Sequence, residues 1–280
     1  MQKDQQPAPV YLSIATVLYR ANNEQLIRFR EALVTSIHKL RTHCPVARIS
    51  LAVVDNAASE DGDGFSRLFT GIPGVDALRF ITPEKNLGYG RAHNLCIYQG
   101  SDFHLILNPD VYLEPDALLV GINYLQTHPG TGMVTPHGIN NNGQPLFLSK
   151  RYPTVLDFLL RGFAPLPLRQ LFSARLARYE MHDVYKGDAP FDGIEIASGC
   201  CMLFNTSALQ KIKGFCEDYF LYFEDFDLSV RLQDVAQISY VPQMKIIHEG
   251  GHAARKGWWH IRQFSVSGFR FFSQHGWRWL

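Results

Sequence analysis

Short apolar runs alternate with segments of helical periodicity in the first half of the chain, and this pattern restricts the fold more than any other feature. Residues 10–19 are rich in β-branched and aromatic side chains, which is typical of a buried strand. Asn22 or Asn23 can then cap a helix, because apolar residues follow at intervals of three and four, at Leu26, Phe29, Leu33, Ile37 and Leu40. A strand followed by an amphipathic helix is the repeating unit of α/β proteins.

The same alternation continues along the chain and becomes less regular in the second half. Further strands are predicted at residues 49–55, 77–82, 105–107, 133–135, 145–148, 194–204 and 238–241. Helices are predicted at 65–69, at 92–98, from Pro115 onward, as two short amphipathic helices within 154–178, and at 226–235 and 258–275. The order predicts an α/β fold with a mostly parallel sheet, helices on both faces and a mixed extension.

Composition and charge argue against several classes of protein. Hydrophobic residues make up 46% of the 280 residues and charged residues 19%, which is ordinary for a globular protein. The formal net charge of +1 predicts no bulk attraction to nucleic acid. Five cysteines without C-x-x-C spacing indicate reduced thiols in a cytosol. No apolar stretch approaches the ~20 residues of a membrane-spanning helix, so membrane contact is expected only at the surface.

Polar side chains close two of the predicted strands. Asp55 ends the second apolar run, and Asn108 and Asp110 follow the run at 105–107. Ligands bind outside the carboxyl ends of parallel strands, so Asp55 is a candidate for hydrogen bonds from a base or ribose. The Asn108 and Asp110 oxygens can point at one divalent cation. Each residue can equally be a turn or helix-capping residue, because Asp and Asn are common after strands.

Six segments in a fixed order resemble the motifs of family-2 inverting glycosyltransferases, which have the GT-A fold. They are residues 53–59 (VVDNAAS), 86–94 (NLGYGRAHN), 108–110 (NPD, where the family carries D-x-D), 197–203 (ASGCCML), 220–228 (FLYFEDFDL), and His248 followed by Gly250 and Gly251. The resemblance covers nearly the whole chain and extends to the bacterial rhamnosyltransferase-like subgroup, which builds lipopolysaccharide, O-antigen and other surface glycans.

The resemblance implies one Rossmann-like GT-A domain over residues 1–280. Its donor-binding half covers about 10–135, its acceptor-side half about 136–255, and a C-terminal amphipathic helix about 257–280. Donor contacts are expected at Thr16, Tyr19, Asp55, Asn56, Asn86, Gly88, Arg91 and Asn108, and acceptor contacts at Ser198 and Gly199.

The resemblance also implies a metal site and a base. Asp110 and His248 are the expected ligands of Mg²⁺ or Mn²⁺, Asp225 is the expected base, and Glu224 is its rival. Asn108 departs from the family pattern because it replaces the first carboxylate of D-x-D. Asp110 is therefore expected to be the principal protein ligand, with further oxygens supplied by the donor diphosphate.

The residue chemistry agrees with such a reaction. A carboxylate near an acceptor hydroxyl can remove its proton, and direct displacement then inverts the anomeric centre without an enzyme nucleophile. Glu224, Asp225 and Asp227 open a predicted helix, whose dipole favours ionised carboxylates. The alternative is that these acids only cap the helix, which is the expected role of Asp227.

Residues 86–94 also invite interpretation as a phosphate-binding loop. His93 stands where the third glycine of a dinucleotide-binding motif belongs, and the segment follows the third strand rather than the first. We expect a turn and helix start near the donor, with Arg91 as a candidate diphosphate contact. His93 can equally be structural.

Two other classes of protein are alternatives to a glycosyltransferase. A nucleotidyltransferase needs a glycine-rich basic loop after the first strand, and residues 19–23 contain no glycine. A non-catalytic carbohydrate-binding or lipid-binding protein on the same fold is favoured by Asn108, whereas Asp110, Asp225 and His248 favour an enzyme.

The expected substrates and location follow from the subgroup and from aromatic segments rich in arginine. The expected donor is dTDP-L-rhamnose, with a UDP-hexose as runner-up, and the expected acceptor is a polyprenyl-diphosphate-linked glycan on the inner face of the cytoplasmic membrane. Interfacial contact is predicted for residues 158–178 and 258–280, including Trp277 and Trp279, aided by Arg161, Arg169, Arg175 and Arg178. Phe264 and Phe271 are instead expected to pack onto the sheet.

Overall fold

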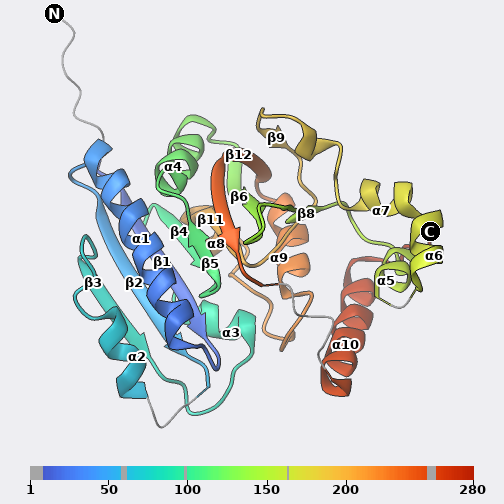
Figure 1. The fold of residues 1–280 in the computed structure, drawn as a ribbon, viewed down its shortest axis with the longest axis horizontal. Coiled ribbons are helices and arrows are strands. Elements are labelled where there is room, and N and C mark those ends of the chain that lie inside the picture. Colours follow the sequence, from blue (N-terminus) through green and yellow to red (C-terminus); the bar gives the residue numbers. More distant parts are fainter. Residues whose placement is uncertain (1–8, 58–61, 98–99, 163, 251–256) are drawn as a thin grey trace, which may run out of the picture.

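The computed structural model describes residues 9–57, 62–97, 100–162, 164–250 and 257–280. Its main sheet contains β1 (Tyr11–Leu18), β2 (Arg48–Asp55), β3 (Ala77–Ile81), β4 (Phe103–Leu107), β5 (Val111–Leu113), β6 (Thr131–Ile139), β7 (Pro145–Leu146), β9 (Phe191–Asp192), β11 (Cys201–Asn205) and β12 (Gln237–His248). The strand order is β3-β2-β1-β4-β11-β6-β12-β5, with β7 beside β6 and β9 beside β12 (Figure 1). A second, two-stranded sheet pairs β8 (Ser149–Lys150) with β10 (Ile196–Ala197).

The pairing confirms the predicted parallel sheet and its mixed extension. β1 pairs in parallel with β2 and β4, and β2 pairs in parallel with β3. β11 then runs antiparallel to both β4 and β6, while β6 and β12 are parallel. The sheet is therefore regular at its N-terminal strands and mixed beyond β4.

Helices cover both faces of this sheet. α1 (Asn23–His43), α2 (Gly62–Phe69) and α4 (Ala117–Thr127) pack on one face, and α3 (Tyr89–Asn94), α8 (Thr206–Lys211) and α9 (Glu224–Gln233) on the other. The Asn22 side chain accepts a hydrogen bond from Gln25 N, which confirms the predicted cap of α1.

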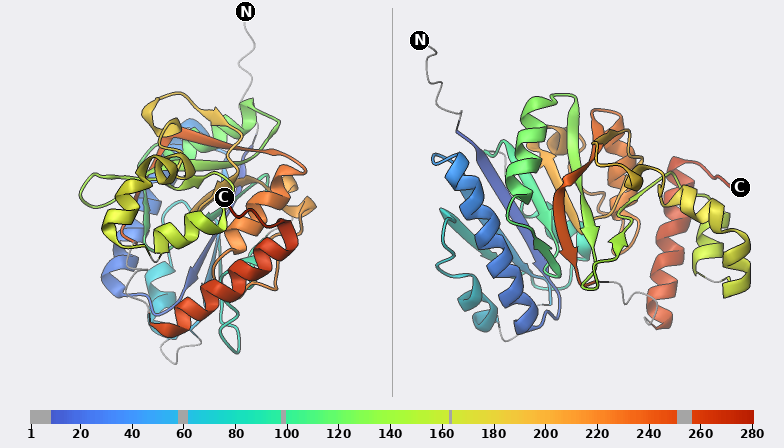
Figure 2. Two further views of the ribbon diagram at one scale, coloured as in Figure 1. Left: turned by 90° about the vertical axis from the view of Figure 1, so that its right-hand side faces the viewer. Right: turned by 45° about the horizontal axis from the view of Figure 1, so that its top comes forward.

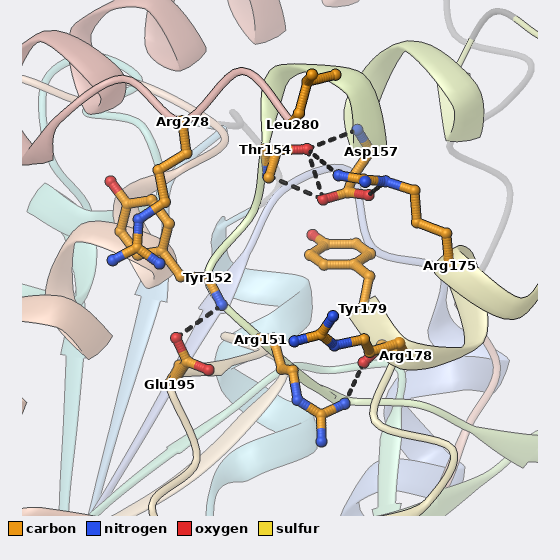
Figure 3. Close-up of a pocket in the computed structure, with 10 residues that line it drawn as sticks. All are labelled: Arg151, Tyr152, Thr154, Asp157, Arg175, Arg178, Tyr179, Glu195, Arg278 and Leu280. Carbon is orange, nitrogen blue, oxygen red and sulfur yellow. Dashed lines mark hydrogen bonds and ion pairs between the residues drawn. The ribbon is translucent and has the colours of Figure 1, made fainter. Parts of the chain in front are cut away.

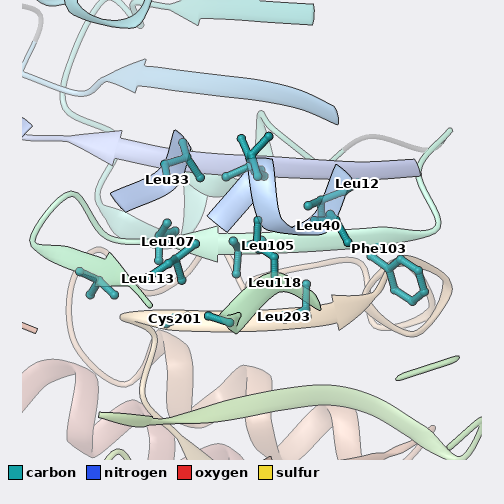
Figure 4. Close-up of a cluster of buried hydrophobic side chains, with 14 of the residues drawn as sticks. Leu12, Leu33, Leu40, Phe103, Leu105, Leu107, Leu113, Leu118, Cys201 and Leu203 are labelled. Atoms are coloured by element: carbon teal, nitrogen blue, oxygen red, sulfur yellow. The ribbon is translucent and has the colours of Figure 1, made fainter. Parts of the chain in front are cut away.

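Alternating side chains of β4 divide the core into two clusters. Leu105 and Leu107 face α1 and α4, whereas Ile106 faces α8 and α9. In Figure 4, Leu33 and Leu118 lie against the first of these faces. All five are at most 1% exposed, so both faces of the strand are buried as predicted for a parallel sheet.

A cluster of four helices, which we call the C-terminal helical cluster, stands at the side of the sheet (Figure 2). It consists of α5 (Val155–Gly162), α6 (Leu166–Leu171), α7 (Ser173–Tyr179) and α10 (Trp258–His275), and a short 3-10 helix follows at Val184–Lys186. Phe271 is fully buried and Phe264 is partly buried, but both pack against side chains of α5, α9 and the segment before α9 rather than onto the sheet as predicted.

Several predicted boundaries are wrong. Residues 154–178 form three helices, because the backbone leaves helical geometry at Phe172 as well as at Pro165. The helix expected from Pro115 begins at Ala117. α3 begins directly after Gly88, whose φ of +82° ends the preceding turn, rather than at residue 92. Tyr98, at the end of that predicted helix, lies outside the described residues, as does Phe163.

Two global features agree with the sequence. All five cysteines are free thiols. No helix within the described ranges combines the length and the apolar character needed to cross a bilayer.

Candidate active site

The acidic pair Glu224 and Asp225 occupies the first turn of α9. The two residues before it, Tyr222 and Phe223, have left-handed φ values of 68° and 65°. This conformation costs free energy in residues other than glycine and is concentrated at functional sites. It turns the chain sharply, so that the acidic pair faces the turn between β10 and β11.

Asp225 is held in place by backbone donors. Its Oδ2 accepts a hydrogen bond from Gly199 N and its Oδ1 accepts one from Phe226 N, each at 3.0 Å. A Cβ atom on Gly199 would lie 3.3 Å from the Asp225 Cβ, so only glycine leaves this contact relaxed. The predicted base and one predicted acceptor-side residue are therefore in direct contact.

The two acids differ in their protonation. Burial, with a further contribution from the Asp225 charge, raises the pKa of Glu224 to about 8. Burial also raises the pKa of Asp225, but its backbone N–H donors and the Lys150 charge oppose that rise. Glu224 Oε2 has no hydrogen-bond partner in the described part of the chain. Asp225 is therefore the better candidate for an ionised base, and Glu224 is neutral near pH 7.

Asp227 has a different role from the one predicted. Its carboxylate forms an ion pair with Arg231 at 2.7 Å and lies 2.8 Å from His275 Nε2, rather than capping α9. Asp227 thereby ties α9 to α10, because the helix start is set by the backbone turn and leaves no need for a side-chain cap.

Lys150 is a residue near the base that the sequence did not single out. It ends β8, and its Nζ donates to Phe147 O at 2.6 Å. Burial, with the nearby Arg161 charge, lowers the pKa of Lys150 to about 7, and Glu180 and Asp225 oppose this shift. No motif surrounds Lys150, so only the tertiary structure reveals a buried amine close to the base.

Tyr89 links the acceptor side to the donor side. Its hydroxyl lies 2.5 Å from Gly199 O and 2.9 Å from Asn108 Oδ1. Burial raises the pKa of Tyr89 well above its usual value, so the hydroxyl keeps its proton. Tyr89 belongs to the motif at 86–94, but the sequence predicted no function for it, because its contacts come from segments that are distant in sequence.

Asp110 and His248, the predicted metal ligands, are neighbours because β5 pairs with the end of β12. Asp110 Oδ2 lies 3.3 Å from His248 Nε2, while Asp110 Oδ1 is buried without a hydrogen-bond partner among the described residues. A Cβ on Gly250 would come within 2.5 Å of both side chains. Burial lowers the pKa of His248, but its hydrogen bonds to Asp110 and Cys200 outweigh this and raise it to about 10.

An orphaned carboxylate oxygen and an imidazole, with no side chain at Gly250 to fill the space beside them, fit a divalent cation, which the imidazole can ligate once it has lost its proton. In the described ranges, no group of three or more His, Cys, Asp or Glu side chains could hold a metal alone. The replacement of the first carboxylate of D-x-D by Asn108 agrees with a site to which donor diphosphate oxygens contribute. Gly251 lies outside the described residues.

The predicted donor residues of β1 and β2 lie at the carboxyl ends of these strands. Thr16 and Asp55 are fully buried, and Thr16 Oγ1 has no partner within the described ranges. Asp55 Oδ1 accepts from Ala57 N at 3.2 Å. Tyr19 is 52% exposed just beyond β1. Their donor contacts stay predictions, and Ser59 of the same motif is outside the described residues.

The motif at 86–94 is tied to β2 by amide hydrogen bonds. Asn56 Nδ2 donates to Asn86 Oδ1 and Gly88 O, each at 3.0 Å. A Cβ at Gly88 would come within 2.1 Å of Phe220 O, so glycine is required there. Arg91 Nε donates to Glu217 O at 2.6 Å. Asn56 and Asn86 thus already hold the loop that presents Tyr89.

Two other predicted residues have protein contacts of their own. His93 is fully buried, and burial together with His104 lowers its pKa to about 3, so it is a neutral core residue. Ser198 N donates to Leu148 O at 2.8 Å and fixes the turn before Gly199.

Curated relatives are rhamnosyltransferases. The chain is 27% identical over 191 residues to the N-acetylglucosaminyl-diphospho-decaprenol L-rhamnosyltransferase of Mycobacterium tuberculosis, covering 63% of this chain and 60% of that protein. It is 24% identical to the rhamnosyltransferase WbbL of Escherichia coli K12, covering 62% of this chain and 67% of that protein. The aligned segment thus spans about three fifths of the mycobacterial relative. No family model matches the sequence.

A solved structure has the same fold. The mannosyltransferase PcManGT from Pyrobaculum calidifontis, in complex with GDP-Man and Mn²⁺, has a TM-score of 0.58 at 17% identity, covering 95% of this chain and 64% of that one. The chain is therefore rhamnosyltransferase-like in sequence and has the GT-A fold of glycosyltransferases, as its motifs indicated.

Proposed function

We propose that this chain is an inverting glycosyltransferase that transfers L-rhamnose from dTDP-L-rhamnose to a hydroxyl of a lipid-linked glycan in bacterial surface polysaccharide synthesis. One observation carries the proposal: Tyr89 joins the Asn108 side, next to Asp110 and His248, to the Gly199 turn that holds Asp225. A chain of hydrogen bonds thus runs from the base to Asn108, two residues before the proposed metal ligand Asp110.

The residues divide the chemistry between them. Asp110 and His248 would hold a divalent cation, which when bound neutralises the charge on the departing diphosphate. Asp225 accepts the proton of the acceptor hydroxyl as that oxygen attacks the anomeric carbon. Neutral Glu224 leaves the Asp225 charge without a repelling neighbour. In this proposal, residues of about 10–135 bind the donor and those of about 136–255 bind the acceptor.

The donor is tested by binding. A thermal-shift screen of dTDP, UDP and GDP with Mg²⁺ or Mn²⁺ identifies the nucleotide, because a ligand that binds only the native state raises the melting temperature. A dTDP-specific shift supports the rhamnose donor. A UDP-specific shift would favour the alternative UDP-hexose donor, and no shift in any arm would contradict a nucleotide-sugar enzyme.

Activity separates the enzyme from its non-catalytic alternative. Incubation of the protein with the preferred sugar nucleotide and Mn²⁺ should release the nucleoside diphosphate, faster when a diphosphate-linked glycan is present. A protein that binds the nucleotide but releases none would instead be a binding module.

Peripheral membrane contact is part of the proposal and is supported by the C-terminal helical cluster. Leu166, Leu171, Trp258 and Phe269 are 66–79% exposed there, and Trp279 is 64% exposed. Such side chains favour headgroup depth in a bilayer. Of the predicted arginines, Arg161 and Arg175 are already ion-paired, whereas Arg169 and Arg178 have no carboxylate partner in the described part of the chain.

Vesicle flotation tests this contact. The protein should float with phosphatidylglycerol vesicles at low salt, and Leu166→Ser with Leu171→Ser should reduce that fraction. Val235→Ser, at a 41% exposed site outside the cluster, is the control. A protein that stays in the soluble fraction at low salt would contradict membrane contact.

A further inference from the structure

A polar cavity of about 250 Å³ lies between the C-terminal helical cluster and the chain that leads out of β8. Arg151 enters it from that chain, Arg175 and Arg178 from α7, and Arg278 from the segment after α10 (Figure 3). Four arginines from three separate segments thus line one cavity, together with two carboxylates, Asp157 and Glu195.

The carboxylates in the cavity are already engaged. Asp157 Oδ2 accepts from Thr154 N and Oγ1, and its Oδ1 accepts from Arg175 Nε at 2.7 Å. Glu195 Oε2 accepts from Tyr152 N at 3.1 Å. Asp157 and Arg175 thus form a charge-balanced pair in the wall of the cavity, whereas Glu195 is held by a backbone donor.

Two arginines keep an uncompensated charge. Arg151 is paired with Asp183 at 2.7 Å, outside the cavity lining. Arg178 and Arg278 have no carboxylate partner among the described residues, and the Arg278 guanidinium instead stacks on the Tyr152 ring at 3.9 Å. Stacking fixes the orientation of a guanidinium while leaving its N–H donors free for an anion.

The Tyr179 hydroxyl is a second, independent sign of a missing ligand. Tyr179 is only 3% exposed, lines the cavity, and its hydroxyl has no hydrogen-bond partner in the described part of the chain. In Figure 3 this hydroxyl lies below the Asp157 side chain, on the side of the ring away from Arg151 and Arg178. Buried hydroxyl groups almost always have a partner, so an acceptor is missing here.

We propose that this cavity binds a phosphate or diphosphate group, and specifically the diphosphate of the lipid-linked acceptor. Guanidinium groups and a hydroxyl donor are the groups that recognise phosphate oxygens. The cavity is smaller than the ~300–1,000 Å³ typical of pockets for larger ligands, which favours a compact anion over a sugar nucleotide. Assignment to the acceptor rests on the proposed function.

The surroundings of the cavity fit a lipid diphosphate. Exposed apolar side chains lie on neighbouring elements: Leu166 and Leu171 on α6, which contacts α5 and α7, and Trp279 next to Arg278 in the sequence. On its inner side, Lys150 Nζ lies 5.7 Å from the centre of the Tyr179 ring, and Lys150 is close enough to Asp225 to influence its pKa. A diphosphate held here has its lipid toward the apolar surface and its sugar toward the base.

Calorimetry in EDTA tests the cavity with two probes, inorganic pyrophosphate and farnesyl diphosphate. Both should bind, and Tyr179→Phe and the double variant Arg178→Gln/Arg278→Gln should each weaken binding by about 10-fold or more. Arg48→Gln/Arg67→Gln removes the same charge from exposed positions outside the cavity and outside the segments proposed for membrane contact, and should change affinity less than ~2-fold. Equal losses in both double variants, or no pyrophosphate binding, would overturn the proposal.

Three further measurements keep the outcomes distinct. Tyr179→Phe should retain its melting temperature, because its hydroxyl has no protein partner to lose. Farnesyl diphosphate should bind more tightly than pyrophosphate, whereas equal affinities would overturn the lipid assignment. Binding to phosphatidylglycerol vesicles that depends on Tyr179 and resists farnesyl diphosphate would assign the cavity to a phospholipid headgroup instead.

The failure of this proposal is separable from failure of the proposed function. dTDP binding with Mn²⁺ should be unchanged in the cavity variants if the donor site is elsewhere. If the unmodified protein did not bind dTDP, the proposed dTDP-sugar donor would be contradicted, whereas pyrophosphate binding in EDTA would still support the proposed cavity site.

Discussion

Strand β4 and the first turn of helix α9 bury different kinds of side chain. β4 places the apolar side chains of Leu105 and Ile106 on its two faces, and both are fully buried. The first turn of α9 instead buries the carboxyl group of Glu224, and the end of β8 carries the Lys150 amine; the pKa values of both groups are shifted toward their neutral forms. The apolar strand belongs to the rigid frame, whereas these two groups, which are costly to bury, lie where chemistry is proposed.

The largest expected effect tests this division at Asp225. Asp225→Asn should lower sugar transfer by ~10²–10⁴-fold, because an amide cannot accept the acceptor proton. dTDP binding should persist, since Asp225 is not among the residues proposed to bind the donor. Steady-state transfer and calorimetry measure the two properties separately.

Asp234→Asn provides the matched control, because Asp234 is an exposed residue at the far end of the same helix. Its transfer rate should be unchanged. Near-normal turnover in Asp225→Asn would remove Asp225 from the role of base and direct attention to Glu224.

The next largest effect compares packing in the two halves. Leu33→Ala, at a 1% exposed position of α1, should lower the free energy of unfolding by about 2–5 kcal/mol. Leu171→Ala, at a 76% exposed position of α6, should change it by less than ~0.5 kcal/mol. Urea unfolding measures both, and a large loss in Leu171→Ala would show that this leucine is a core residue.

Asp110 and Asn108 sharpen the comparison on the donor side. Asp110→Ala should weaken dTDP binding in Mn²⁺ more than Asn108→Ala does, because a carboxylate is the better ligand of a hard cation and Asn108 Oδ1 already contacts Tyr89. Calorimetry gives the ranking. Equal losses of dTDP affinity in the two variants would contradict the ranking. Full transfer activity in EDTA would contradict any metal requirement.

The first strand and helix could be predicted well because the features that indicate them are contiguous in the sequence. Strand β1 and the capped helix α1 depend on contiguous apolar periodicity, so residues 10–19 and the cap at Asn22 were predictable. Strand β12 runs over Gln237–His248, but only 238–241 were predicted. Its C-terminal part follows a register shift and alternates buried with exposed residues. A search for continuous apolar residues does not recognise this part of the strand, because charged residues such as Lys245 interrupt it.

The site was predictable only where motifs carry it. Asp110 and His248 are neighbours as the family resemblance implied, and Asp225 contacts Gly199. Lys150 and the cavity around Tyr179 are absent from the prediction, because their segments are distant in sequence and meet only through tertiary packing. A single lysine, arginine or tyrosine outside a motif does not indicate in the sequence which distant residues it will contact in the fold.

The smallest expected effect concerns the cost of burying Glu224. Its pKa rises from 4.5 in the unfolded chain to about 8 in the fold, so the folded state binds the proton more tightly. The stability that this proton contributes is fully present below pH 4.5 and is lost as pH rises through about 8. Glu224→Gln should therefore match the unmodified protein near pH 4 and exceed it by on the order of 1–3 kcal/mol near pH 9. Urea unfolding at both pH values measures this, with the exposed Glu31→Gln as a control that should show no such difference. If Glu224→Gln gave no gain at high pH, Glu224 would be ionised in the fold, and the contrast between the apolar strand β4 and the buried neutral acid of α9 would fail at its central residue.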